Sequence, residues 1–191
     1  RALQAQPQER FNIVNSRDIY GHGTSVAGIA ASVAPMADLI IVKLDNPKEN
    51  GFPSTAQLMQ AIDFCVKRGL FYGRPIAINI SFGNNYGSHD GTSLLSTFID
   101  DASNVGRNVI VIGTGNEGSS AGHTSGVLTE NEETEIQLAV QENSPSLNVQ
   151  IWKGYFDVFD ISLISPSGVK IGPIQEQLGS QRFTVGNTQI L

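Results

Sequence analysis

The chain of 191 residues is long enough for one sizeable domain or two small ones. Its composition, with 40% hydrophobic and 16% charged residues, is typical of a folded globular protein. A formal net charge of −6 without any basic run argues against a nucleic-acid partner. The single cysteine, Cys65, excludes an internal disulfide, and no apolar run reaches the roughly 18 residues that a membrane helix needs.

The first 17 residues are polar and weakly periodic, which predicts a loop or an edge segment. His22 follows between two glycines that permit a sharp turn, and a run of small apolar residues predicts a helix over 22–32 suited to burial against a sheet. Thr24 or Ser25 would cap its first turn. Histidine is the usual general base near neutral pH, but a core histidine ahead of a buried helix explains the same pattern.

Strand-length apolar runs and helical patterns then alternate along the chain. The runs that predict strands are 37–44, 76–82 and 108–114. One helix is predicted from a capping box at 54–57 to Gly69, and a second over 90–105, which Gly106 ends. The polar segment 45–53 predicts a loop, and Cys65 is interpreted as a buried structural thiol on the apolar face of the first of these helices. This alternation implies an α/β fold with a parallel sheet buried on both faces.

After residue 126 the helical periodicity disappears. Short runs that predict strands lie at 135–141, 147–152, 155–165, 169–174 and 181–185, with turns predicted at 143–146 and 165–168. We expect an antiparallel all-β module, such as a sandwich or a jelly roll.

Four ordered motifs carry a family resemblance: HGTSVAG at 22–28, VAPMADLIIVKL at 33–44, NISFG at 79–83 and GTGNEG at 113–118. This set, within residues 18–126, resembles the histidine, strand, substrate and oxyanion segments of the subtilisin-like serine proteases, or subtilases. The resemblance implies that 1–126 is part of an α/β catalytic domain with a parallel sheet and flanking helices. Some subtilases, including the clostridial Csp-type proteases, carry a β insertion after the oxyanion segment, and 127–191 is interpreted as such a jelly-roll-like module.

The resemblance also implies roles for particular residues. His22 would be the general base that takes the proton from a serine, and Asn116 would donate its side-chain amide to the oxyanion. An asparagine that tolerates a left-handed turn is the alternative for Asn116. Ser81, Phe82 and Gly83 would bind an extended peptide or protein substrate, and Gly113, Thr114 and Gly115 would form the opposite wall of its side-chain pocket.

Two groups that a subtilase needs are not recognised in the chain. The segment 91–93 has the first three letters of the nucleophile motif, but it precedes Asn116, and Ser93 is interpreted as a helix cap. Asp18 stands four residues before His22, too close to be the orienting acid, and is interpreted as a surface or cleft-rim residue. We therefore expect a fragment, inactive alone, whose parent protein supplies both groups; the alternative is a catalytically dead pseudoprotease that acts as a binding or regulatory module.

No cofactor or metal is expected. The calcium loop that the family often carries after its histidine helix is missing, because Ser32 runs directly into Val33. His89 and His123 lack partners at metal-ligand spacing and are interpreted as surface residues. By family resemblance, an extracellular or spore- or cell-envelope-associated location is expected.

Overall fold

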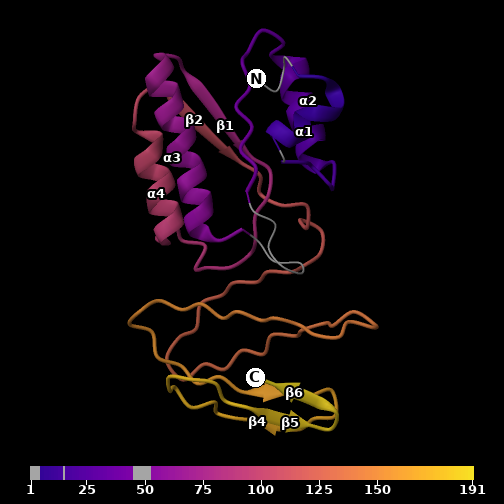
Figure 1. The fold of residues 1–191 in the computed structure, drawn as a ribbon. Helices are drawn as coiled ribbons and strands as arrows, with labels where there is room; N and C mark the ends of the chain where they lie inside the picture. The colour runs from indigo at the N-terminus through magenta and orange to yellow at the C-terminus, as the bar shows by residue number, and fades with distance from the viewer. Residues whose placement is uncertain (1–4, 15, 45–52) are drawn as a thin grey trace. The chain divides into compact units, whose positions relative to one another are not determined.

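The computed structural model describes residues 5–14, 16–44 and 53–191, and the chain divides into two compact units, Arg1–Ala139 and Val140–Leu191. The sequence-based boundary after residue 126 stays a prediction. No described helix is long and apolar enough to cross a membrane. The elements, drawn in Figure 1, are η2 Pro7–Glu9, α1 Arg10–Ile13, α2 His22–Val33, α3 Thr55–Tyr72, β1 Ile76–Ile80, α4 Leu94–Ser103, β2 Asn108–Ile112, β3 Leu163–Ile164, β4 Lys170–Ile171, β5 Phe183–Val185 and β6 Thr188–Ile190.

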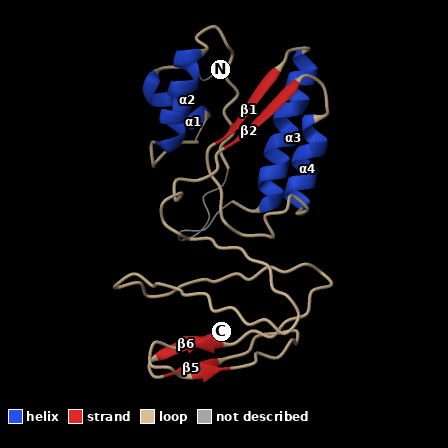
Figure 2. Cartoon of the chain, turned by 180° about the vertical axis from the view of Figure 1, so that it is seen from behind, coloured by secondary structure: helices blue, strands red, loops and turns tan. Residues whose placement is uncertain are grey.

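A parallel strand pair covered by two helices forms the ordered centre of the first unit. β1 pairs with β2 in a register that sets Ile76 opposite Asn108 and Ile80 opposite Ile112. Helices α3 and α4 pack on each other and lie side by side against one face of this pair (Figure 2). The predicted α/β alternation with a parallel sheet is confirmed for these four elements.

The hydrophobic core lies between α3, α4 and that face of the pair. Its buried members are Ile62, Cys65, Val66, Ile78, Ile80 and Ala102. Cys65 is only 8% exposed, so the prediction of a buried thiol is confirmed, and this burial raises the pKa of the thiol. The opposite face is open: Ala77 and Asn79 of β1 are exposed, and Val109 and Val111 of β2 are each 53% exposed. The expectation of strands buried on both faces is therefore wrong for both strands.

Replacement of Ile62 by alanine should be the most damaging single change in this core. Ile62 is only 1% exposed, and its removal leaves a cavity between α3 and β1. We expect the free energy of unfolding to fall by about 3 kcal/mol, measured by urea denaturation of the intact protein. Phe71→Ala is the control on the same helix, because Phe71 is 74% exposed, and it should cost less than about 1 kcal/mol.

The ends of the helices follow local signals. Ser54 caps α3 through the predicted capping box, in which its side chain accepts from the Gln57 backbone and the Gln57 side chain accepts from the Ser54 backbone. Gly69 was expected to end this helix, but α3 continues for another turn. Gly73 ends it instead in a left-handed conformation, with φ at +61°, whereas Gly69 is buried and allows Ile76 to approach closely.

Two expectations for the first unit are wrong. The segment 37–44 is not a strand, because no other described strand pairs with it, and its residues Leu39 and Ile41 are 51% and 71% exposed. Helix α2 forms as predicted, but none of its residues is buried, and Val33 is 81% exposed. Most of the predicted loop 45–53 lies outside the described residues.

The second unit contains two short antiparallel pairs, β3 with β4 and β5 with β6. The predicted turn at 165–168 joins the first pair, with Gly168 N–H donating to the Ser165 carbonyl at 2.8 Å. Two expected strands are not found: 147–152 in this unit, and 135–141, which spans the boundary between the two units. Ile136 and Ile151 are 60% and 56% exposed, and a jelly roll is not confirmed.

Candidate active site

Helix α2 begins at His22, and the glycine before it makes the turn. Gly21 occupies the N-cap position in the left-handed region, with φ at +80°, which a residue with a Cβ rarely adopts. The Ser25 hydroxyl donates to the Gly21 carbonyl at 3.0 Å, so it does not act as an N-cap. The expectation that Thr24 or Ser25 caps this helix is therefore wrong.

The structure brings the His22 ring to the end of β1. His22 Nε2 lies 2.9 Å from the carbonyl oxygen of Ser81, which is 59 residues further along the chain. A carbonyl oxygen only accepts, so Nε2 carries the hydrogen in this contact. A base that takes a proton from a serine must instead accept at Nε2, with a hydrogen held at Nδ1. The observed pairing is therefore not the one that a general base makes, and this contact must break before Nε2 can accept a proton.

The other predicted substrate residues follow the carboxyl ends of the two parallel strands. Ser81, Phe82 and Gly83 come directly after β1, and Ser81 Oγ accepts from Asn79 Nδ2 at 2.8 Å. Gly113 continues the pairing beyond β2, since its N–H donates to the Ile80 carbonyl at 3.1 Å. Both predicted walls therefore start at the same sheet edge, where open α/β sheets bind their ligands.

Asn116 lies in the turn after Gly113. The residue that adopts the left-handed conformation there is Gly115, with φ at +95°, and Asn116 is not among the described non-glycine residues with positive φ. A left-handed turn therefore does not explain this asparagine. Its backbone N–H donates to Glu117 Oε2 at 2.9 Å. Within the described part of the chain, no direct hydrogen bond joins Asn116, Phe82, Gly83, Thr114 or Gly115 to His22.

Asp18 holds the start of α2, a role that its place in the sequence did not indicate. Its Oδ1 accepts from the backbone N–H groups of Tyr20 and Gly21, and its Oδ2 accepts from the backbone and the hydroxyl of Thr24. The bonds from Thr24, followed by the one from Gly21, lower the pKa of this carboxyl to about 2. A lowered native pKa stabilises the fold above the ordinary value of 3.8, and this contribution is lost as the pH falls toward 2.

Ser93 and the loop histidines have the structural roles expected of them. The Ser93 side chain accepts from the Ser96 N–H at 3.1 Å and is the N-cap of α4, so the prediction of a cap is confirmed. His89 and His123 are both exposed, with nearly parallel rings whose centroids are 6.4 Å apart. Among the residues that the structure describes, no group of three or more histidine, cysteine or carboxylate side chains is arranged to hold a metal ion.

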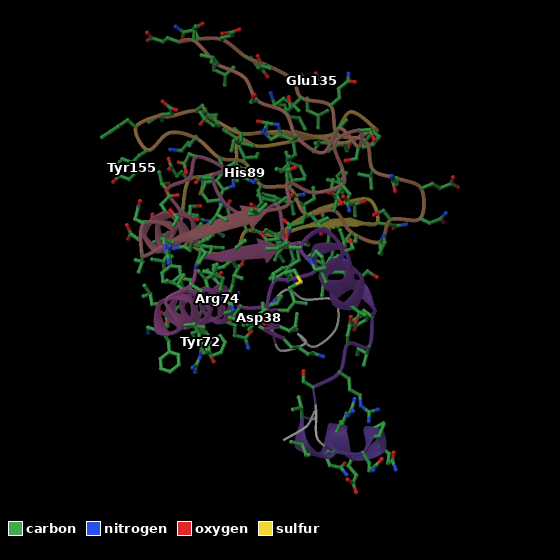
Figure 3. All side chains as sticks on the ribbon, turned by 90° about the horizontal axis from the view of Figure 1, so that it is seen from above. Asp38, Tyr72, Arg74, His89, Glu135 and Tyr155 are labelled. Carbon is green, nitrogen blue, oxygen red and sulfur yellow. The ribbon has the colours of Figure 1, made fainter. Side chains whose placement is uncertain are left out.

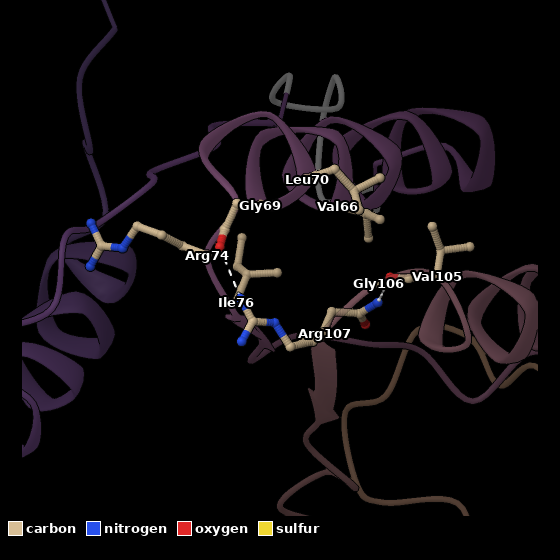
Figure 4. Close-up of a pocket in the computed structure, with 10 residues that line it drawn as sticks. Val66, Gly69, Leu70, Arg74, Ile76, Val105, Gly106 and Arg107 are labelled. Carbon is tan, nitrogen blue, oxygen red and sulfur yellow. Dashed lines mark hydrogen bonds between the residues drawn. The ribbon is translucent and has the colours of Figure 1, made fainter.

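A small pocket lies at the opposite, amino-terminal end of the strand pair (Figure 4). It has a volume of about 130 Å³ and is lined by residues that include Val66, Leu70, Ile76, Arg107 and Asn108. Arg74 borders the pocket and forms an ion pair with Asp38; both residues are labelled in Figure 3. Since α/β sheets carry their sites at the carboxyl ends of strands, we assign no function to this pocket.

Comparison with known proteins identifies the family of the chain. Residues 5–148 match the model of the subtilase family. Among solved structures, the chain is similar to the Clostridium perfringens CspB protease, with 32% identity and a TM-score of 0.52. The similarity covers 63% of this chain but only 28% of the CspB protease chain, and no curated protein matches the chain. The match over 5–148 includes His22, the strand pair and Asn116, and the chain belongs to the subtilase family.

Proposed function

We propose that the intact protein is a serine endopeptidase, to which this chain contributes the general base and one oxyanion donor. The observation that carries the proposal is the 2.9 Å contact between His22 Nε2 and the Ser81 carbonyl. It joins the histidine motif to the predicted substrate strand in a chain that belongs to the subtilase family. A histidine exposed beside the carboxyl ends of parallel strands is accessible to both a serine and a peptide.

In this proposal, His22 removes the proton from a serine hydroxyl, which attacks the peptide carbonyl and forms an acyl-enzyme. His22 then donates that proton to the leaving amine, and water hydrolyses the acyl group. Asn116 stabilises the negative charge that develops on the carbonyl oxygen. The observed conformation of Asn116, with negative φ beside the left-handed Gly115, supports a chemical reason for this residue type.

The peptide would bind as an added strand between the two segments that follow β1 and β2. Ser81, Phe82 and Gly83 offer backbone groups beyond the last paired residue of β1. Gly113, Thr114 and Gly115 would form the facing wall, since Gly113 is anchored on the Ile80 carbonyl. Thr114 carries a hydroxyl and would give the side-chain pocket a polar element.

The nucleophilic serine and the orienting aspartate would come from segments of the parent protein outside this chain. Ser93 is engaged as a helix cap, and the Asp18 oxygens bind the backbone and the Thr24 hydroxyl. The resting contact of His22 with the Ser81 carbonyl fits a ring without its serine and aspartate partners. The chain alone should therefore hydrolyse no peptide bond above a control without protein.

The test is covalent labelling of the intact protein with a fluorophosphonate, which phosphonylates only an activated serine. We expect a labelled serine outside this chain, identified by mass spectrometry, and loss of labelling in His22→Ala. The control His89→Ala changes another exposed histidine and should label like the wild type. Absence of labelling in folded, mature protein would overturn the proposal and favour a pseudoprotease that keeps the cleft for binding.

A further inference from the structure

One carboxylate organises the whole turn that leads into His22. The Asp18 oxygens accept from Tyr20 N at 3.1 Å, Gly21 N at 2.8 Å, Thr24 N at 2.8 Å and Thr24 Oγ1 at 2.8 Å. These donors lie on both sides of His22 in the chain, so the carboxylate ties the turn before the ring to the first helical turn after it. Asp18 itself is exposed, so these bonds are not required to satisfy a buried charge.

The carboxylate acts on the backbone that carries the ring and does not contact the ring itself. Oδ1 fixes Gly21, whose φ of +80° sets the direction in which α2 starts. Oδ2 binds Thr24, in the first turn of α2, where the free N–H groups and the helix dipole favour a negative charge. The two anchors therefore hold the backbone immediately before and after His22.

We propose that Asp18 is a positioning residue for His22: it holds the backbone on both sides of the residue, so that the ring stays beside the end of β1. The inference rests on the proposed function, because a position for a base has meaning only if His22 is one. The hydrogen bonds from Thr24 and Gly21 lower the pKa of Asp18 to about 2, so the carboxylate stays charged throughout the range in which histidine bases work. We call the four hydrogen bonds that Asp18 accepts from Tyr20, Gly21 and Thr24 the clamp, and its acceptor is charged across this range.

The test compares the fluorophosphonate kinetics of the intact wild-type protein with Asp18→Ala, Asp18→Asn, Thr24→Val and Thr24→Ser. For Asp18→Ala we expect kinact to fall between about 10-fold and 100-fold with KI unchanged, because the base is displaced while the substrate walls are intact. Thr24→Ser keeps the hydroxyl donor, so its kinact should equal that of the wild type. The kinact values of Thr24→Val and Asp18→Asn should lie between those of the wild type and Asp18→Ala. A general loss of folded protein would instead lower the fraction that is labelled and leave the rate of that fraction unchanged.

Hydrogen exchange on the same samples keeps the two proposals distinguishable. Asp18→Ala should speed exchange of the amides at 19–25 and leave α3 and α4 unchanged, which is a local effect of a lost clamp. A labelled wild type with equal kinact in Asp18→Ala would overturn the positioning role and leave the proposed function standing. An unlabelled wild type would overturn both, whereas faster exchange across all helices in Asp18→Ala would show that Asp18 serves only global stability.

Discussion

Replacement of His22 by alanine should lower kcat/KM for peptide hydrolysis by the intact protein on the order of 10⁴-fold or more. The imidazole would serve twice in each turnover, once as the base for the serine and once as the acid for the leaving amine. No other described side chain is hydrogen-bonded to the Ser81 carbonyl at this edge of the sheet. The measurement is the steady-state cleavage of a fluorogenic peptide mixture, with melting temperature recorded to show that the variant is folded.

His89 supplies the matched control for this experiment. It is also exposed and also bonds a backbone carbonyl, that of Asn85 at 2.9 Å, on the loop that follows β1. His89→Ala should retain the wild-type kcat/KM within about twofold, because surface changes away from a site have small effects. Equal losses in the two variants would mean that any histidine removed from this edge disturbs the fold, and the role of His22 as base would be contradicted.

The parts of the fold that could be predicted depend on residues close together in the chain. The Ser54 and Ser93 caps are confirmed because each involves a hydroxyl and an N–H three residues away. The pair of β1 and β2 is confirmed because one helix, α4, separates the two apolar strands in the chain, and such a connection favours parallel strands. Gly69 shows the limit of such signals, since its missing side chain serves close packing against Ile76 and not the end of α3.

The parts that could not be predicted depend on distant partners. A strand forms only beside another strand, and the described residues offer none to the apolar segment 37–44. The alternating segment around Ile136 and Leu138 has the pattern of a strand, but both residues stay more than half exposed. Alternation indicates which residues would share a face; it does not provide the second layer that buries them.

Within the candidate site, the sequence predicted which segments meet but not how they are held. Motif order identified His22 and the segment after β1, and the contact with the Ser81 carbonyl joins them. The family resemblance gives no role to an acid four residues before the histidine, so it does not predict the function of Asp18. The signal that identifies it is local: an aspartate shortly before a glycine-led helix start is well placed to accept the free N–H groups there.

Replacement of Asn116 by alanine should lower kcat by about 10²-fold to 10³-fold with little change in KM, the usual effect of losing one oxyanion donor. The amide would bind the carbonyl oxygen only when negative charge develops on it, so the loss falls on the transition state and not on substrate binding. The same fluorogenic assay of the intact protein measures both constants.

Asn116→Gly separates this role from a conformational one. Glycine permits every backbone conformation of the 113–118 turn but cannot donate from a side chain. If Asn116 is the oxyanion donor, the glycine variant should be as slow as the alanine variant. If the residue only shapes the turn, glycine should restore the rate, although the left-handed position is already occupied by Gly115 and Asn116 does not need it. Recovery of kcat in Asn116→Gly would therefore contradict the oxyanion role directly, whatever the behaviour of His22.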